Sequence, residues 1–397
     1  MPISALPWHR RSRMPTALAR PTALTATLTA ALTVALSGCG PGANGGAGGE
    51  TRASAAASRD AAVRTAVRAL VADGAAPGAA VLVRDGRNTR FTAAGVADIR
   101  TGRRIRRNDH FRAGSLTKTV IAATTLRLAA QGRLRLDDRV ARHLPGLVAG
   151  QGNDGRRITL RQLLNHTSGL YDYTADPELA RQLNAADTRT RTPASLVRTA
   201  VSHRPYFRPG SGWRYSNTNY VLLGMVIERV TGRPYAEAAR RLGLRPLALD
   251  ATTFPGTRST LPAPHGRAYS GEDGARRDVT DLNPSAAGAA GEMVSTLDDL
   301  TRLVSGLQRG RATDRAGLRA MRDTSASHGR YGMGLFPVRL PCGVRLWGHN
   351  GEITGSYALA VSTPDGRRSL AYRLNSGARP SAAAESALLK AAFCSGG

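Results

Sequence analysis

Two residues near position 115 have the types and the spacing that nucleophilic catalysis needs. Ser115 and Lys118 stand three positions apart in the segment AGSLTKT, at the start of a helix expected over 115–131, and Lys118 is one of only two lysines in the chain. Residues i and i+3 share one face of a helix. A buried lysine can lose its proton, and the neutral amine can then accept the proton of a serine hydroxyl. The alternative is a helix start with a solvated lysine, because S-x-x-K alone arises often by chance.

Two further segments carry side chains that could complete such a site. WRYSNTNY contains Tyr215 and Asn217; a tyrosine can act as a general acid or base, and an asparagine amide can hold a carbonyl group or a lysine. LWGHNGEITGSYAL contains His349, Asn350 and Gly351 on an expected strand. The histidine could add positive charge or a proton path, and the glycine allows close approach of a ligand. The structural alternatives are a helix N-terminus for the first segment and an ordinary strand end for the second.

Elements from both ends of the chain must position these residues. The hydrophobic pattern predicts a helix and two strands at the start, and a helix, four strand-like runs and a closing helix at the end. The runs that carry this prediction are 59–73, 78–86, 90–98, 297–307, 333–340, 343–347, 355–362, 368–374 and 381–393. Residues 146–284, between these groups, are mostly helical in pattern. We therefore predict an α+β fold, with an antiparallel sheet built from both chain ends, flanked by helices and carrying an inserted, mostly helical domain.

The N-terminal residues are expected to lie outside the folded domain. A basic segment without acids precedes an apolar stretch at 22–37, which ends in LSGC, a segment similar to a bacterial lipobox. We expect a lipoprotein signal peptide at 1–38 with lipidation of Cys39; the alternative is an ordinary secretory signal. The Gly/Ala-rich residues 39–58 are predicted to be a flexible tether to a domain over 59–395. The protein would then be exported, and either anchored to the outer face of the cell membrane or secreted.

Charge and cysteine content limit the possible partners. The chain of 397 residues has a formal charge of +28, carried almost entirely by arginine. These arginines are scattered singly among acids, without a basic stripe or interleaved aromatic residues, so we expect no nucleic-acid binding. If Cys39 carries lipid, Cys342 and Cys394 remain, and a pair of cysteines in an exported chain predicts a disulfide. No motif suggests a metal, and we expect no metal or cofactor.

Taken together and in this order, S-x-x-K, Y-S-N and H-x-G resemble the motifs of the penicillin-recognising serine hydrolases. That family includes actinomycete D-Ala-D-Ala carboxypeptidases, class C β-lactamases and related esterases. The resemblance covers roughly residues 60–395, and the segments that carry it are LLNHTSGLYDY, SNTNYVLLGMVIERVTG, YGMGL, CGVRLWGHNG and AAFC. It implies the β-lactamase/DD-peptidase fold and hydrolysis through an acyl-enzyme. The chain has no G-x-S-x-G elbow, which disfavours an α/β-hydrolase.

The resemblance also implies roles for individual residues. Ser115 would be the acylated nucleophile and Lys118 its base, and Tyr215 would pass protons to the leaving group and later from the water. Asn217 would hold the substrate amide. The backbone N–H groups of Ser115 and Glu352 would form the oxyanion hole.

Two histidines have different expected roles under the same resemblance. His349 stands where many relatives have a lysine, and we expect it at the catalytic site. His166, in the segment NHTSG, belongs to a loop that is structural in the family.

Several positions that recognise substrate depart from the actinomycete carboxypeptidase pattern. That pattern has an arginine for the terminal carboxylate of the substrate where this chain has Phe336, and threonines where it has Asn350 and Glu352. We expect these positions to contact substrate, and we expect substrates with a free C-terminal carboxylate to be handled poorly. The alternative is that Arg330 or Arg339 replaces the missing arginine.

The activity that the resemblance names best is a serine-type D-Ala-D-Ala carboxypeptidase related to β-lactamases. One alternative is an esterase or another acyl hydrolase acting on substrates without a free carboxylate. Another is a penicillin- or peptidoglycan-binding module that is acylated slowly and hardly turns over. The substrate would be a small molecule or a peptide, such as a peptidoglycan stem peptide or a β-lactam. We expect a monomer that reaches the membrane only through its N-terminal lipid.

Overall fold

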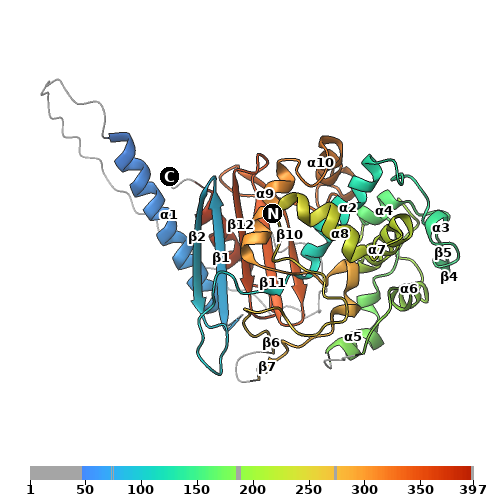
Figure 1. The fold of residues 1–397 in the computed structure, drawn as a ribbon, viewed down its shortest axis with the longest axis horizontal. Helices are drawn as coiled ribbons and strands as arrows, with labels where there is room; N and C mark the ends of the chain where they lie inside the picture. Colours follow the sequence, from blue (N-terminus) through green and yellow to red (C-terminus); the bar gives the residue numbers. More distant parts are fainter. Residues whose placement is uncertain (1–46, 73, 75, 185–188, 272–274, 395–397) are drawn as a thin grey trace, which may run out of the picture.

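The computed structural model describes residues 47–72, 74, 76–184, 189–271 and 275–394 (Figure 1). The predicted signal peptide and Cys39 lie outside these residues. Within the described part of the chain, no helix is long and apolar enough to cross a membrane.

A six-stranded antiparallel sheet lies at the centre of the molecule (Figure 1), in the order β2-β1-β12-β11-β10-β9. Its strands are β1 (Gly78–Asp85), β2 (Asn88–Gly95), β9 (Phe336–Arg339), β10 (Arg345–Ile353), β11 (Ser356–Ser362) and β12 (Arg368–Leu374). β1 pairs with β12, with Val81 opposite Tyr372, so strands from the two ends of the chain meet inside the sheet. The predicted α+β fold is confirmed.

Two layers of helices cover the two faces of the sheet. α1 (Ala47–Ala72) and α11 (Ala382–Phe393) pack together on one face. α9 (Leu297–Gln308) and α2 (Thr117–Ala130) belong to the hydrophobic layer on the other face. Successive residues of a strand point to opposite faces, so Val81 packs in the first layer and its neighbour Leu82 in the second.

The region between the two groups of strands is mostly helical and lies to one side of the sheet (Figure 1). Its central helix is α7 (Asn217–Thr231), which contacts α2 and ends at Gly232 in a left-handed conformation that glycine adopts easily. The other helices are α3 (Val140–His143), α4 (Leu160–Leu164), α5 (Pro177–Asn184), α6 (Pro193–Val201), α8 (Tyr235–Ala239) and α10 (Arg315–Arg322). Short strand pairs are β3 (Phe111–Arg112) with β8 (Val294–Ser295), β4 (Ala149–Gly150) with β5 (Asn153–Asp154), and β6 (Tyr269–Ser270) with β7 (Arg277–Asp278).

The predicted tether is wrong over residues 47–58. α1 begins at Ala47, so the second half of the segment 39–58 is helical. Alanine has the highest helix propensity of all residues, and a helix extends easily from a turn that is already packed. The C-terminal half of α1 is packed in this way, because Val67 and Leu70 are fully buried against the sheet. Residues 39–46 lie outside the described part.

The predicted disulfide between Cys342 and Cys394 is confirmed. Cys342 lies in the turn between β9 and β10, and Cys394 follows the last residue of α11. The bond therefore ties the C-terminal helix to the edge of the central sheet.

Removing this disulfide is expected to destabilise the domain. The bond closes a loop of 52 residues, for which the chain-entropy model gives up to about 4 kcal/mol of free energy of unfolding. The measurement is urea unfolding of the Cys342→Ser, Cys394→Ser double variant beside the oxidised wild type. Wild-type protein with the bond reduced serves as the control and should match the variant. An unfolding midpoint equal to that of the oxidised protein would contradict the expectation.

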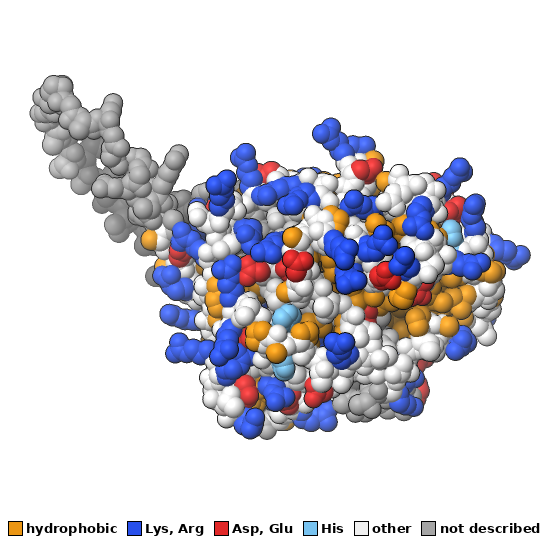
Figure 2. Space-filling model, viewed as in Figure 1, with side chains coloured by type: hydrophobic (Ala, Val, Ile, Leu, Met, Phe, Trp, Pro, Cys, Tyr) orange, Lys and Arg blue, Asp and Glu red, His pale blue; other side chains and the backbone are white. Residues whose placement is uncertain are grey.

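On the face that Figure 2 shows, the charge is spread rather than concentrated. Figure 2 shows Lys and Arg side chains distributed over the visible face, with acidic side chains among them. Many of these arginines form ion pairs, such as Arg107 with Asp298 and Arg368 with Asp85. This arrangement differs from the concentrated basic stripe that nucleic-acid interfaces present.

Candidate active site

Ser115 lies in a short 3-10 turn directly before α2, and strand β10 passes close to this turn. Gly114 has a φ of +53°, and a Cβ there would lie 2.6 Å from the backbone nitrogen of Glu352. A Cβ on Gly351 would lie 1.8 Å from the carbonyl oxygen that precedes the turn. The two glycines therefore let the backbone of β10 pack directly against the turn. Gly351 serves this packing and is not among the described residues that line the cavity, and its expected contact with substrate stays a prediction.

The Lys118 amine is buried and has three partners. Nζ lies 3.0 Å from Ser115 Oγ, 2.7 Å from Asn217 Oδ1 and 2.6 Å from the carbonyl oxygen of Ala290. The two carbonyl oxygens can only accept hydrogen bonds, so they take two N–H groups of the amine. In the neutral amine, the lone pair is then left for the Ser115 hydroxyl, which is the one partner that has a proton to give. The geometry thus fits a neutral lysine acting as a base.

The environment of Lys118 favours this neutral form. Burial lowers the pKa of Lys118 to about 7, and the carboxylate of Asp172 acts in the opposite direction. The rings of Tyr215 and Tyr220 lie 4.8 Å and 5.6 Å from Nζ, and their faces, like Asp172, favour the protonated form. An amine with a pKa near neutrality can take up a proton and release it again at the same pH, as a general base must.

Tyr215 lies beside the nucleophile, in the loop before α7. Its side chain is hydrogen-bonded to that of Ser115; burial raises the pKa of Tyr215 well above its usual value, and this hydrogen bond opposes the rise. The phenol is therefore protonated and can donate a proton. Its ring stacks on His166 at a centroid distance of 4.1 Å. His166 has a structural role, because its Nδ1 accepts hydrogen bonds from Ser216 N at 3.2 Å and Asn219 Nδ2 at 3.0 Å.

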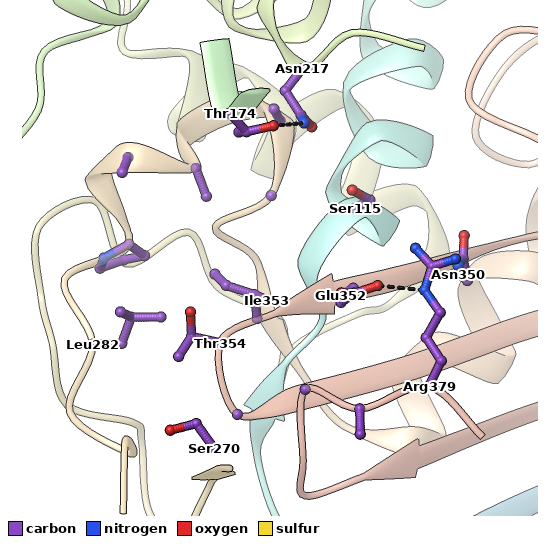
Figure 3. Close-up of a pocket in the computed structure, with 18 of the residues that line it drawn as sticks. Ser115, Thr174, Asn217, Ser270, Leu282, Asn350, Glu352, Ile353, Thr354 and Arg379 are labelled. Carbon is purple, nitrogen blue, oxygen red and sulfur yellow. Dashed lines mark hydrogen bonds and ion pairs between the residues drawn. The ribbon is translucent and has the colours of Figure 1, made fainter. Parts of the chain in front are cut away.

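The Asn217 side chain connects Lys118 to a carboxylate that the sequence analysis did not single out. Asn217 Nδ2 donates to Asp172 Oδ1 at 3.2 Å and Oδ2 at 3.1 Å. It also donates to Thr174 Oγ1 at 3.2 Å (Figure 3). Asp172 belongs to the segment LLNHTSGLYDY, which carries part of the family resemblance. The resemblance therefore identifies the segment, but it does not single out Asp172 within it. Both ends of the Asn217 amide are thus bound within the protein, and a substrate amide would have to share these partners.

A cavity of about 770 Å³ opens at Ser115. Figure 3 shows it extending from the serine past Ile353 and Thr354 toward Leu282 and Ser270. This part of the cavity combines apolar side chains with hydroxyl groups, which suits an organic substrate larger than a single functional group.

A pair of opposite charges lies close to the nucleophile, on the other side of the cavity (Figure 3). Arg379 Nε and Glu352 Oε2 are 2.6 Å apart, and both residues line the cavity. The two side chains are 40% and 44% exposed, so a substrate can reach either charge. Arg379 lies between β12 and α11, and in the sequence nothing distinguishes it from the other arginines.

The comparison with protein families decides the assignment of this site. Residues 63–393 match the family model described as Beta-lactamase. The chain belongs to the beta-lactamase family. It is therefore a serine hydrolase of that family, as the three motifs imply.

Within the beta-lactamase family, the chain is similar to hydrolases with several named activities. A D-stereospecific amidohydrolase from Streptomyces sp. is 45% identical, with 85% of this chain and 99% of that chain covered and a TM-score of 0.77. The D-amino acid amidase from Ochrobactrum anthropi is 28% identical, with 84% and 98% covered and a TM-score of 0.72. Esterase EstB of Burkholderia gladioli is 36% identical over 176 residues, which are 43% of this chain and 45% of the esterase. The chain thus spans less than half the length of the curated relatives that it matches.

His349 of this beta-lactamase-family chain is buried and is not among the described residues that line the cavity. Its Nε2 accepts a hydrogen bond from the Tyr331 hydroxyl at 2.9 Å, and its Nδ1 contacts the carbonyl oxygen of Asn350. Burial lowers the pKa of His349 to about 3, so the ring is neutral. A neutral ring contradicts the positive charge, which is one of its two expected roles; the other role, a proton path at the catalytic site, stays a prediction. His349 instead supports Tyr331, whose ring meets Tyr215 edge-on at 5.9 Å.

The positions expected to recognise substrate differ in whether they reach the cavity. Asn350 lines the cavity, as expected. Phe336 is only 4% exposed and packs against the His349 ring at 5.4 Å, so its predicted contact with substrate is wrong. The physical reason is that the alternation along β9 turns Phe336 into the core. Neither Arg330 nor Arg339 is among the described residues that line the cavity; Arg379 provides the cation there.

Proposed function

We propose that this chain hydrolyses amides or esters of D-amino acids through an acyl-enzyme on Ser115. The observation that carries the proposal is the Lys118 amine, which two carbonyl oxygens hold 3.0 Å from Ser115 Oγ at the end of an accessible cavity. The named activities of two relatives that cover most of the chain, a D-stereospecific amidohydrolase and a D-amino acid amidase, support this substrate class.

In the proposed reaction, Ser115 Oγ attacks the acyl carbonyl carbon while its proton passes to Lys118 Nζ. The backbone N–H groups of Ser115 and Glu352 would stabilise the resulting oxyanion. Tyr215 donates its proton to the leaving nitrogen or oxygen, and Lys118 restores that proton to the tyrosine. A water molecule then attacks the acyl-enzyme, giving up its proton through the same groups, and the carboxylic acid is released.

The position of Glu352 favours substrates with a free amino group. Its N–H would hold the oxygen of the acyl carbonyl, and the α-ammonium of an aminoacyl group lies only one carbon from that carbonyl. Glu352 also lines the cavity at Ser115, so its carboxylate could receive that ammonium group, although Arg379 balances part of its charge. This arrangement favours the acyl-hydrolase alternative, in which the substrate has no free carboxylate.

D-Ala-D-Ala carboxypeptidase activity is the second candidate function. Arg379 lines the cavity, and a guanidinium can bind the terminal carboxylate of a peptide in a bidentate manner. To do so, it would have to release Glu352.

Neutralising each of the two charges in turn, at Glu352 and at Arg379, is expected to separate these activities. Glu352→Gln should lower kcat/KM for D-phenylalanine amide about tenfold, because a charge-assisted contact at a half-exposed carboxylate lies at the low end of about 1.5–3 kcal/mol. N-acetyl-D-phenylalanine amide, which lacks the charge, should be hydrolysed equally by variant and wild type. Arg379→Gln should weaken hydrolysis only of peptides with a free C-terminal carboxylate.

The matched control for the first variant is Glu237→Gln, which removes a half-buried carboxylate of α8 that pairs with Arg233. It should leave both kcat/KM values unchanged. A wild-type preference for a D-Ala-D-Ala peptide over D-phenylalanine amide would contradict the proposal and support the carboxypeptidase.

A further inference from the structure

We infer that Asp172 is a positioning residue for the nucleophile: it fixes the orientation of the Asn217 amide and supplies the negative charge that balances Lys118. The inference rests on the proposed roles of Ser115 and Lys118, and it is independent of which acyl group is cleaved. Asp172 is 6% exposed and lines the cavity.

The contacts of the Asp172 carboxylate are all with hydrogen-bond donors. Oδ1 accepts from Thr174 N at 3.1 Å and Thr174 Oγ1 at 3.0 Å, and both carboxylate oxygens accept from Asn217 Nδ2. Burial raises the pKa of Asp172, and these donors together with the charge of Lys118 oppose that rise. A set made only of donors fits the ionised form, which can only accept.

This carboxylate determines which end of the Asn217 amide faces Lys118. Because Asp172 can only accept, Nδ2 must turn toward it, and Oδ1 is left to accept from Lys118 Nζ. If the amide turned over, Nδ2 would face the amine and would compete with the Ser115 hydroxyl for its lone pair. The orientation that Asp172 imposes therefore keeps the lone pair of the neutral lysine available to the nucleophile.

Asp172 also differs in charge from the other titratable groups around Lys118. Those groups are Tyr215, Tyr220, His166 and His349. Burial raises the pKa of both tyrosines and lowers the pKa of both histidines, so all four are neutral near neutral pH. The negative charge that faces Lys118 from this set thus comes from Asp172, and it acts to keep the lysine protonated.

The test is the pH dependence of covalent labelling by a fluorophosphonate probe, which reports the activation of Ser115 without a natural substrate. In Asp172→Asn, the new Nδ2 would face Asn217 Nδ2, and the Asn217 amide would turn over. We expect labelling at its optimum to fall about tenfold or more. We also expect the acid limb of the profile to move to lower pH by more than about half a unit, since an opposite charge nearby stabilises the protonated lysine.

The matched control is Asp176→Asn, in the same loop, where the carboxylate pairs with His203 instead. It should keep the wild-type rate and acid limb. An acid limb that stays in place in Asp172→Asn would overturn the inference even if labelling slows, because a loosened loop lowers the rate at every pH. If that variant does not fold, Thr174→Val removes the hydroxyl that contacts both Asp172 and Asn217, and a wild-type labelling rate would overturn the inference. Wild-type protein that resists labelling would instead refute the proposed role of Ser115.

Discussion

Ser115→Ala is expected to abolish hydrolysis, with kcat/KM falling by at least about 10³-fold. Alanine has no oxygen that could attack the acyl carbon, and no acyl-enzyme can form at this position. Lys118, Tyr215 and the backbone N–H groups would remain in place, so only the modest catalysis that comes from binding and charge stabilisation would survive. The measurement is steady-state hydrolysis of D-phenylalanine amide and of a p-nitrophenyl ester.

The control for this variant is Ser202→Ala, which removes an exposed hydroxyl at the end of α6. It should retain wild-type activity toward both substrates. The thermal unfolding midpoint of Ser115→Ala should stay close to that of the wild type, because the substitution removes one small, partly exposed hydroxyl. Hydrolysis of either substrate by Ser115→Ala at a tenth of the wild-type rate or more would contradict the role of Ser115.

Lys118→Met is expected to be almost as damaging, with a loss of about 10³-fold in kcat/KM. Methionine fills a similar volume but offers no lone pair to the Ser115 hydroxyl. Lys118→Arg should also fail, because a guanidinium stays protonated at every accessible pH and cannot accept a proton. The loss in Lys118→Met should not result from unfolding, since removing a buried amine also removes the free-energy cost of its desolvation.

The pH dependence of kcat/KM tests the same role of Lys118 and has a predicted direction. With a pKa of about 7, Lys118 carries a proton below neutral pH and cannot act as a base, so wild-type kcat/KM should rise as pH increases through about 7. This limb should be missing from the residual activity of Lys118→Met. The control is Lys390→Met on the exposed face of α11, which changes the only other lysine of the chain. If kcat/KM of Lys118→Met rose with pH as that of the wild type does, another group would be the base.

The residues whose chemistry depends on short-range spacing could be predicted from the sequence. Ser115 and Lys118 are neighbours on one helical turn, whereas Tyr215 and Asn217 are placed beside them by the family resemblance. The central sheet could be predicted for a similar reason, because its strands show their alternation and their turns locally.

Residues placed by tertiary packing could not be predicted in this way. Arg379 meets Glu352 only because the loop after β12 returns to the end of β10, and Asp172 meets Asn217 across two loops. A motif position also does not say which face of a strand a side chain takes. The side chains of Phe336 and His349 are both buried, and their rings pack together. Burial excludes the substrate contact expected for Phe336 and the positive charge expected for His349.

The most direct test of the account is peptide mass spectrometry of protein inactivated by a fluorophosphonate probe. The expected result is one phosphonyl adduct, formed with loss of fluoride, on the peptide that contains Ser115. In Ser115→Ala, we expect no adduct and no change of the residual activity when the probe is added. An adduct on another serine or on Tyr215, or complete inactivation with Ser115 unmodified, would contradict the assignment of Ser115 as the nucleophile.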